Sequence, residues 1–196
     1  MIQLVSFGIK CSIAGSSNGR TLPSGGRYWG SSPWPAVMND DAFEKILKIS
    51  EEFYGTASDP DQMPVSKESA LKLQSIHPDT IAYKLDKVGN PIAWVVVLPT
   101  SLGGMTLFLS KQISERELFE KAVLEKKFEA LYLCGAFVLP EYRRQGHARE
   151  LTLGAISKLS SGKILSLYSW IYSDEGAQLI SNLSKELGRS VVTRHV

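Results

Sequence analysis

A basic turn between an apolar strand and a helix is the feature that most constrains how this chain can fold. The apolar run 131–138 leads into the turn, which reads Val138-Leu-Pro-Glu-Tyr-Arg-Arg-Gln-Gly-His-Ala-Arg149. From Gly146 to about Ser160, apolar residues recur at helical spacing. The first N–H groups of a helix lack intrahelical acceptors, and the helix dipole adds positive potential there. The turn therefore predicts a binding site for an anion, such as the pyrophosphate of a cofactor.

The remaining sequence predicts a mixed α/β domain, in which an early antiparallel hairpin is followed by strand–helix–strand units. The strand 91–99 is apolar throughout, so we expect it to be central in the sheet and covered on both faces. Ser114-Glu115-Arg116-Glu117 is a capping box that predicts a helix start within an inserted segment, 100–130. The other predicted elements are helices over 39–54, 66–76, 146–160 and 174–187, and strands over 80–85, 131–139, 163–171 and 190–195.

The composition excludes several classes of function. A net charge of +2 provides no global field to attract nucleic acid or an anionic membrane, and no apolar run is long enough to span a bilayer. Cys11 and Cys134 have no metal-binding spacing and form no disulfide framework, so we expect no metal and a reduced, cytoplasmic setting. Residues 1–37 are rich in Gly, Ser and Pro and are read as an N-terminal extension of the domain 38–196.

The turn and its flanking elements resemble the acetyl-CoA-binding motif of the GNAT superfamily of N-acyltransferases. The family pattern is Arg/Gln-x-x-Gly-x-Gly/Ala after a strand that ends in Val-x-Pro. This chain has Arg143-x-x-Gly146-x-Ala148 after Val138-x-Pro140. The resemblance is specific over residues 131–160 and extends elsewhere only to the order of elements. It implies an α/β fold with a GNAT-type mixed, splayed sheet, flanked by helices on both faces.

The resemblance also implies where acetyl-CoA, or a close acyl-CoA, would bind. The pantetheine arm is expected to enter the splayed opening and to pair with the backbone of Ala136, Phe137 and Val138. The pyrophosphate is expected on the turn, where backbone amides form a cradle and arginines add charge-assisted hydrogen bonds. We expect His147 to face solvent in the first helical turn. The residues expected at this cofactor site are Arg143, Arg144, Gln145, Gly146, His147, Ala148 and Arg149.

Acyl transfer to an amine needs a proton acceptor, because an alkylammonium ion has a pKa of about 10. The resemblance implies that the base, or a residue that orders a water, lies on the strand before the turn. Alternation along that strand places Tyr132 and Cys134 on one face. Each is a candidate to order a water, and each could instead be a buried packing residue. Glu129, at the start of the strand, is either a base or a solvated loop carboxylate.

The leaving thiolate needs a proton donor. In the family this acid is commonly a Tyr of the last helix, and Ser184 holds that position here. Tyr172, or else Tyr168, is therefore our candidate for the acid. Each of these tyrosines could instead be an aromatic packing residue.

The sequence leaves three hypotheses of function. The first is a cytoplasmic enzyme that transfers an acetyl or short acyl group from acyl-CoA to a primary amine by direct attack in a ternary complex. The second is a non-catalytic acyl-CoA-binding module that senses or regulates, since the usual acid and a strand carboxylate are missing. The third is an unrelated nucleotide-phosphate binder that shares only the turn. The last strand leaves a sheet edge that Ile2–Ile9, or a second copy in a homodimer, could cover.

Overall fold

The computed structural model of the protein describes residues 40–195, so the extension 1–37 and the segment Ile2–Ile9 lie outside the described residues. Within this range the expected α/β fold is confirmed, with six α-helices and five strands. The elements are α1 (Asp40–Tyr54), η1 (Thr56–Ser58), α2 (Lys67–Ile76), η2 (Pro78–Thr80), β1 (Ile81–Leu85), β2 (Pro91–Thr100), α3 (Leu102–Leu109), α4 (Glu115–Leu124), β3 (Ala130–Val138), η3 (Pro140–Tyr142), α5 (His147–Ser160), β4 (Ser166–Ile171), α6 (Asp174–Leu187) and β5 (Val191–His195).

The strands form one open, mixed sheet in the order β1-β2-β3-β4-β5. β2 is antiparallel to both of its neighbours, β1 and β3, whereas β4 is parallel to β3 and β5 is parallel to β4. Every residue of β2 is buried except Val96, which is partly exposed. The prediction that this apolar strand is central is therefore confirmed.

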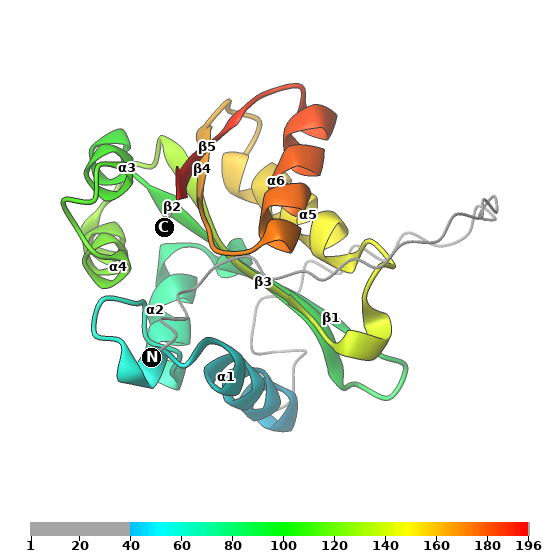
Figure 1. Ribbon diagram of the computed structural model, residues 1–196. Coiled ribbons are helices and arrows are strands. Elements are labelled where there is room, and N and C mark those ends of the chain that lie inside the picture. Colours follow the sequence, from blue (N-terminus) through cyan, green and yellow to red (C-terminus); the bar gives the residue numbers. More distant parts are fainter. Residues whose placement is uncertain (1–39, 196) are drawn as a thin grey trace.

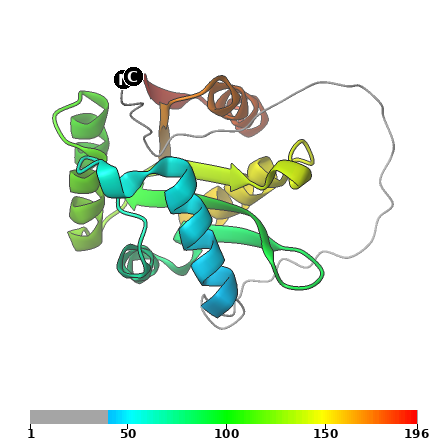
Figure 2. The same ribbon diagram turned by 60° about the horizontal axis from the view of Figure 1, so that its bottom comes forward.

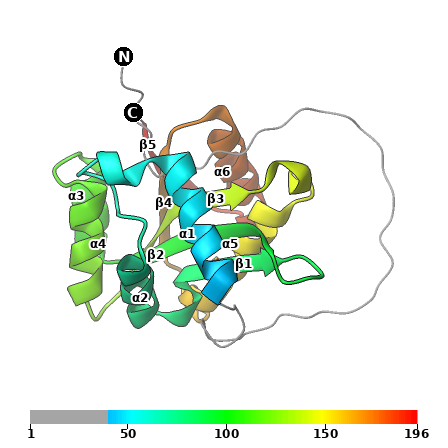
Figure 3. The same ribbon diagram turned by 90° about the horizontal axis from the view of Figure 1, so that it is seen from below.

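Helices cover both faces of the sheet (Figure 1). The helices α1 to α4 lie on one face, where they pack with side chains such as Trp94 and Tyr132. The helices α5 and α6 lie on the other face, against Val95 and Leu131. Figures 2 and 3 show α1 crossing its face of the sheet, with α3 and α4 side by side at one end. Period-two alternation along the strands supplies both layers with apolar side chains.

The strands β3 and β4 separate halfway along β3. Their pairing runs from Ala130–Ser166 to Leu133–Ser169 and does not continue toward Val138. At the last paired position, Ser169 Oγ donates a hydrogen bond to Leu133 O at 3.0 Å. Figure 1 shows the second half of β3 running away from β4, so the sheet is open along this edge.

A bulge in β3 determines which of its side chains face the α1–α4 layer. Leu133 is opposite Val97 and Gly135 is opposite Val96, so Cys134 is an extra residue against β2. Cys134 packs in the α1–α4 layer, and Gly135 lines a pocket on the same side. Two successive residues therefore share this face.

The inserted segment folds as two helices, of which the capping box predicts one. At the start of α4, Ser114 Oγ accepts from the N–H of Glu117, and the Glu117 carboxylate accepts from the N–H of Ser114. The additional helix is α3, whose Gly103 and Gly104 give it a low helix propensity. A Cβ atom on Gly104 would lie 3.3 Å from Leu118 Cδ1. The small residue lets α3 approach α4, so tertiary packing overrides propensity here.

Candidate functional site

The turn before α5 has the backbone conformation of an anion site. Gly146 is the N-cap of α5 with a φ of 81°, and Arg144 has a φ of 62°. Both residues are exposed. Among the described residues, the backbone N–H groups of 144–149 have no backbone or side-chain acceptor, and the first intrahelical bond nearby is from Glu150 N to Gly146 O. Six successive amides are thus available to an anion.

The side chains of this turn differ in how free they are to bind an anion. Arg144 is exposed, whereas Arg143 Nε donates to Val138 O at 3.1 Å. Arg149 donates through Nε and Nη2 to the two carboxylate oxygens of Glu186 in α6. The expectation that His147 faces solvent is wrong, because only 11% of its side chain is exposed. Burial, and then the charge of Lys84, lower its pKa.

The open edge of β3 presents backbone groups next to this turn. Ala136 O accepts a hydrogen bond from Tyr54 Oη at 3.2 Å, and Val138 O accepts the bond from Arg143. Because the N–H and C=O of one strand residue point to the same edge, the N–H groups of Ala136 and Val138 also face the opening. The side chains of Ala136, Phe137 and Val138 are buried, so only their backbone is positioned for a ligand.

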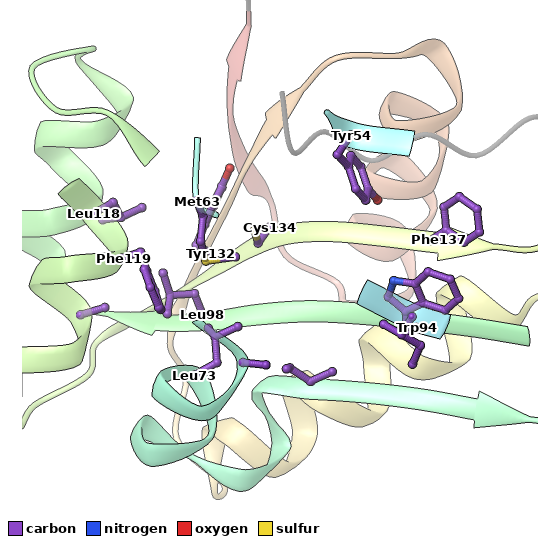
Figure 4. Packing of buried hydrophobic residues seen from close by; sticks show 14 of the residues in the cluster. Tyr54, Met63, Leu73, Trp94, Leu98, Leu118, Phe119, Tyr132, Cys134 and Phe137 are labelled. Carbon is purple, nitrogen blue, oxygen red and sulfur yellow. The ribbon is translucent and has the colours of Figure 1, made fainter. Parts of the chain in front are cut away.

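A buried carboxylate joins the two candidate residues of β3. Glu115, at the first position of α4, is only 1% exposed. Its Oε1 accepts a hydrogen bond from Tyr132 Oη at 2.7 Å and lies 3.6 Å from Cys134 Sγ. Its Oε2 accepts from the backbone N–H of Met63 at 3.1 Å. Figure 4 shows Tyr132 and Cys134 beside Met63 on the face that α4 covers.

Burial makes Glu115 a weak acid. Desolvation raises its pKa from 4.5 to about 7, against hydrogen bonds from Tyr132, Met63 and Cys134 and the positive charge of Arg194, which lower it. Desolvation and the nearby carboxylate also raise the pKa of Tyr132 and of Cys134 well above their ordinary values. Tyr132 and Cys134 are therefore neutral hydrogen-bond donors, and Glu115 is the group of the three that can change charge near neutral pH.

Aromatic rings of β4 and the residue after it pack beside Tyr132 and Arg194. The ring of Tyr168 stacks on that of Tyr132 at 5.1 Å, and its hydroxyl is hydrogen-bonded to Thr100 Oγ1 at 2.8 Å. The Arg194 guanidinium lies over the ring of Trp170 at 4.2 Å. Tyr172 is half-buried and packs against the ring of Trp170 at 4.4 Å. Tyr172 is therefore more accessible than Tyr168, which is fully buried.

Glu115 was not among the residues predicted for the site. The sequence identifies the capping box that contains Glu115, but it does not show that this residue is buried. The carboxylate considered instead, Glu129, lies at the start of β3 and binds Lys127 at 2.7 Å. The hydrogen bond and charge of Lys127 lower the pKa of Glu129, which suits a surface ion pair better than a base. No sequence signal marks Glu115, since its burial depends on β3 and on the chain around Met63.

Comparisons with protein-family models, with curated proteins and with solved structures found no match to this chain. The resemblance of the turn to the GNAT motif therefore rests on the residues themselves. Across residues 40–195, no three or more His, Cys, Asp or Glu side chains are grouped so as to hold a metal ion. Over the same range, no helix is both long and apolar enough to cross a bilayer.

Proposed function

We propose that the protein is a GNAT-type acyltransferase that transfers an acetyl or short acyl group from acyl-CoA to a primary amine. The observation that carries the proposal is the continuity of the open edge of β3 with the amide-rich turn before α5. Both are formed within residues 136–149, and both direct backbone N–H groups outward. An open strand edge suits the amides of a pantetheine arm, and a helix start suits a pyrophosphate.

In the proposed reaction the amine nitrogen attacks the thioester carbon, the C–N bond forms and the C–S bond breaks. The N–H groups of Ala136 and Val138 that face the opening are candidate donors to the carbonyl oxygen as it becomes an oxyanion. The amine gives its proton to Tyr132 Oη, and Tyr132 passes its own proton to Glu115 Oε1. The leaving sulfur then takes up one proton from this pair, either directly or through Tyr172, which is reprotonated from the pair, so that the carboxylate is restored.

A non-catalytic acyl-CoA-binding module is the second candidate, and one observation favours it. Glu115, Tyr132 and Cys134 are at most 1% exposed, so an amine reaches them only if the α1–α4 layer moves. Such a module would use the same turn and strand edge without turnover.

Titration with acetyl-CoA, CoA and ATP, followed by measurement of thiol release with a panel of primary amines, tests these candidates. We expect saturable binding of acetyl-CoA, weak binding of ATP and thiol release that depends on the amine. Binding of acetyl-CoA without thiol release on any amine would select the binding module. Tight binding of ATP with a weak CoA signal would instead select a nucleotide-phosphate binder.

The variant Gly146→Asp tests the anion site, with Gly162→Asp as its matched control. Both glycines have a positive φ and open space around a Cβ atom, so the backbone strain of the two substitutions is comparable. Gly146→Asp adds a negative charge at the turn, and we expect it to weaken acetyl-CoA binding by about 10- to 100-fold, the worth of one hydrogen bond to a charged group. Gly162 lies beyond the other end of α5. Equal acetyl-CoA affinities of the two folded variants would overturn the assignment.

A further inference from the structure

A pocket lies between α1, α2 and the sheet, on the same face of the sheet as Glu115 of α4. Its cavity volume is about 50 Å³, which leaves room for a short hydrocarbon group, and part of it is open to solvent. Phe43 of α1, Leu73 of α2 and Trp94 of β2 are among its lining residues. Figure 4 shows Leu73, Trp94 and Tyr54 among the buried side chains of the α1–α4 layer.

Within residues 40–195, the pocket lining has no polar group that calls for a polar ligand. No charged side chain of this range lines it. Each of the four hydroxyl groups that these residues contribute is already hydrogen-bonded: Ser50 with Trp94 Nε1 at 3.0 Å, Ser66 with Ser69 at 2.9 Å, and Tyr54 with Ala136 O at 3.2 Å. A ligand that brought a charge or an unpaired donor into this space would lose its hydration without replacement. The lining therefore selects for hydrocarbon.

Three lining residues connect the pocket to the candidate site. The backbone N–H of Met63 binds the Glu115 carboxylate, and the Tyr54 hydroxyl binds Ala136 O at the open edge of β3. Gly135 lines the pocket and precedes Ala136 in the chain. A group in the pocket would therefore adjoin both the proposed proton acceptor and the strand edge proposed for the pantetheine arm.

We propose that this pocket binds an aliphatic or aromatic hydrocarbon group attached to one of the two reactants. The group belongs either to the acyl chain of the thioester or to the amine, and the apolar lining suits both equally. The assignment to a reactant rests on the proposed function, whereas the affinity of the pocket for hydrocarbon does not.

Binding of uncharged n-alkanols of increasing chain length to the full-length protein tests the pocket without any CoA. Burial of each added methylene contributes about 0.8 kcal/mol, so we expect affinity to rise about fourfold per carbon and to level off when the chain outgrows the space. Affinity that does not depend on chain length overturns the proposal. Because no thioester is present, a failure of this experiment is distinct from a failure of the acyltransferase assignment.

Ala70→Leu fills the pocket from α2, and Ala177→Leu is its control on the exposed surface of α6. We expect Ala70→Leu to weaken alkanol binding at least tenfold and Ala177→Leu to leave it unchanged. Val96→Phe enters the pocket from β2 and replaces Ala70→Leu if that variant does not fold. Equal alkanol affinity of a folded pocket variant and the control would place the hydrocarbon elsewhere and overturn the proposal.

Two substrate series then identify the reactant that carries the hydrocarbon. In one, acyl-CoA chain length increases with a short amine, and in the other n-alkylamine length increases with acetyl-CoA. We expect kcat/KM to rise with length in one series, and the rise to be lost in the pocket variant but kept in the control. A rise in the first series assigns the pocket to the acyl group, and a rise in the second assigns it to the amine. Thiol release with no dependence on length in either series refutes the assignment to a reactant.

Discussion

Replacement of Glu115 by Gln should stabilise the protein at alkaline pH while removing the proposed acyltransferase activity. The amide can keep the geometry of the site, because its oxygen can accept from the N–H of Met63 and its NH₂ group can donate to Tyr132 Oη, which both donates and accepts. What the substitution removes is the negative charge. Its effect on stability therefore reports the cost of ionising this buried group.

The magnitude follows from the pKa of Glu115. The pKa of Glu115 is about 7 in the folded protein against an ordinary value of 4.5, a difference of about 2.5 pKa units. At about 1.36 kcal/mol per pKa unit, this difference corresponds to about 3 kcal/mol. Because the folded-state pKa is raised, the protonated form of Glu115 is favoured in the folded wild-type protein. Its contribution to stability is fully present below about pH 4.5 and is lost as the pH rises through about 7. The advantage of Glu115→Gln in free energy of unfolding should therefore grow by about 3 kcal/mol across this window.

Urea denaturation of the wild type and Glu115→Gln, at several values between about pH 5 and pH 8, measures this growing difference. Glu120→Gln is the matched control, since Glu120 lies on the exposed side of the same helix. Carboxylates elsewhere titrate in all three proteins, so their contributions cancel in the differences. A Glu115→Gln difference that stays constant with pH would show that Glu115 ionises normally, and the argument for a proton acceptor near neutral pH would fail.

The rate of acyl transfer separates a catalytic role of Glu115 from a structural one. We expect kcat to rise with pH through about 7 in the wild type as Glu115 ionises, and Glu115→Gln to lower kcat by about 100-fold or more. The variant should also lose the inflection near that pH. If the stability changes as calculated but the rate and its pH profile do not, Glu115 is a buried structural group and proton transfer follows another route.

Three further predictions concern the surroundings of the site. Tyr132→Phe removes the proposed proton relay and a hydrogen bond that lowers the pKa of Glu115, so kcat should fall by about 100-fold and the inflection of the residual rate should move to higher pH; an unchanged kcat or an unmoved inflection in the pH–rate profile would contradict this. Glu186→Gln frees Arg149 from its ion pair, and calorimetry at low salt should show acetyl-CoA binding tighter by a few fold, with the gain reduced at high salt. Cys134, whose buried thiol has a raised pKa, should resist alkylation by iodoacetamide until urea unfolds the protein, as mapped by peptide mass; rapid labelling of the folded protein would show that this side of β3 opens.

Local patterns in the sequence were sufficient to predict most elements of the fold. The second strand, β2, is apolar throughout, and the helix start at Gly146 follows a strand and a short basic turn, so burial and conformation could be inferred from neighbouring residues. Helix α3 could not be inferred in this way. Its Gly104 is favourable only because Leu118 of α4 packs closely against it, and that neighbour lies on a different helix.

The sequence predicts the part of the candidate site that is formed by one continuous segment of the chain. The turn and the residues of β3 are contiguous, and alternation placed Tyr132 and Cys134 on one face as predicted, where both contact Glu115. Glu115 itself belongs to a polar capping sequence that is typical of a solvated helix start. Its burial arises because β3 and the backbone of Met63 cover it, which no periodicity within α4 reveals.

Glu115 is an ionisable residue at a buried position of α4, and the reason for an acid at this position needs an explanation. A carboxylate in the first turn of a helix is normally stabilised by the helix dipole, typically by less than about 1 kcal/mol at the surface. Desolvation outweighs that gain here, as its raised pKa shows. The hydrogen bonds to Tyr132 and to the N–H of Met63 do not require an ionisable group, because a glutamine could make both. Packing and hydrogen bonding therefore account for a polar residue at this position but not for an acid, which the positive charge of Arg194 and the proposed transfer of a proton near neutral pH would both favour.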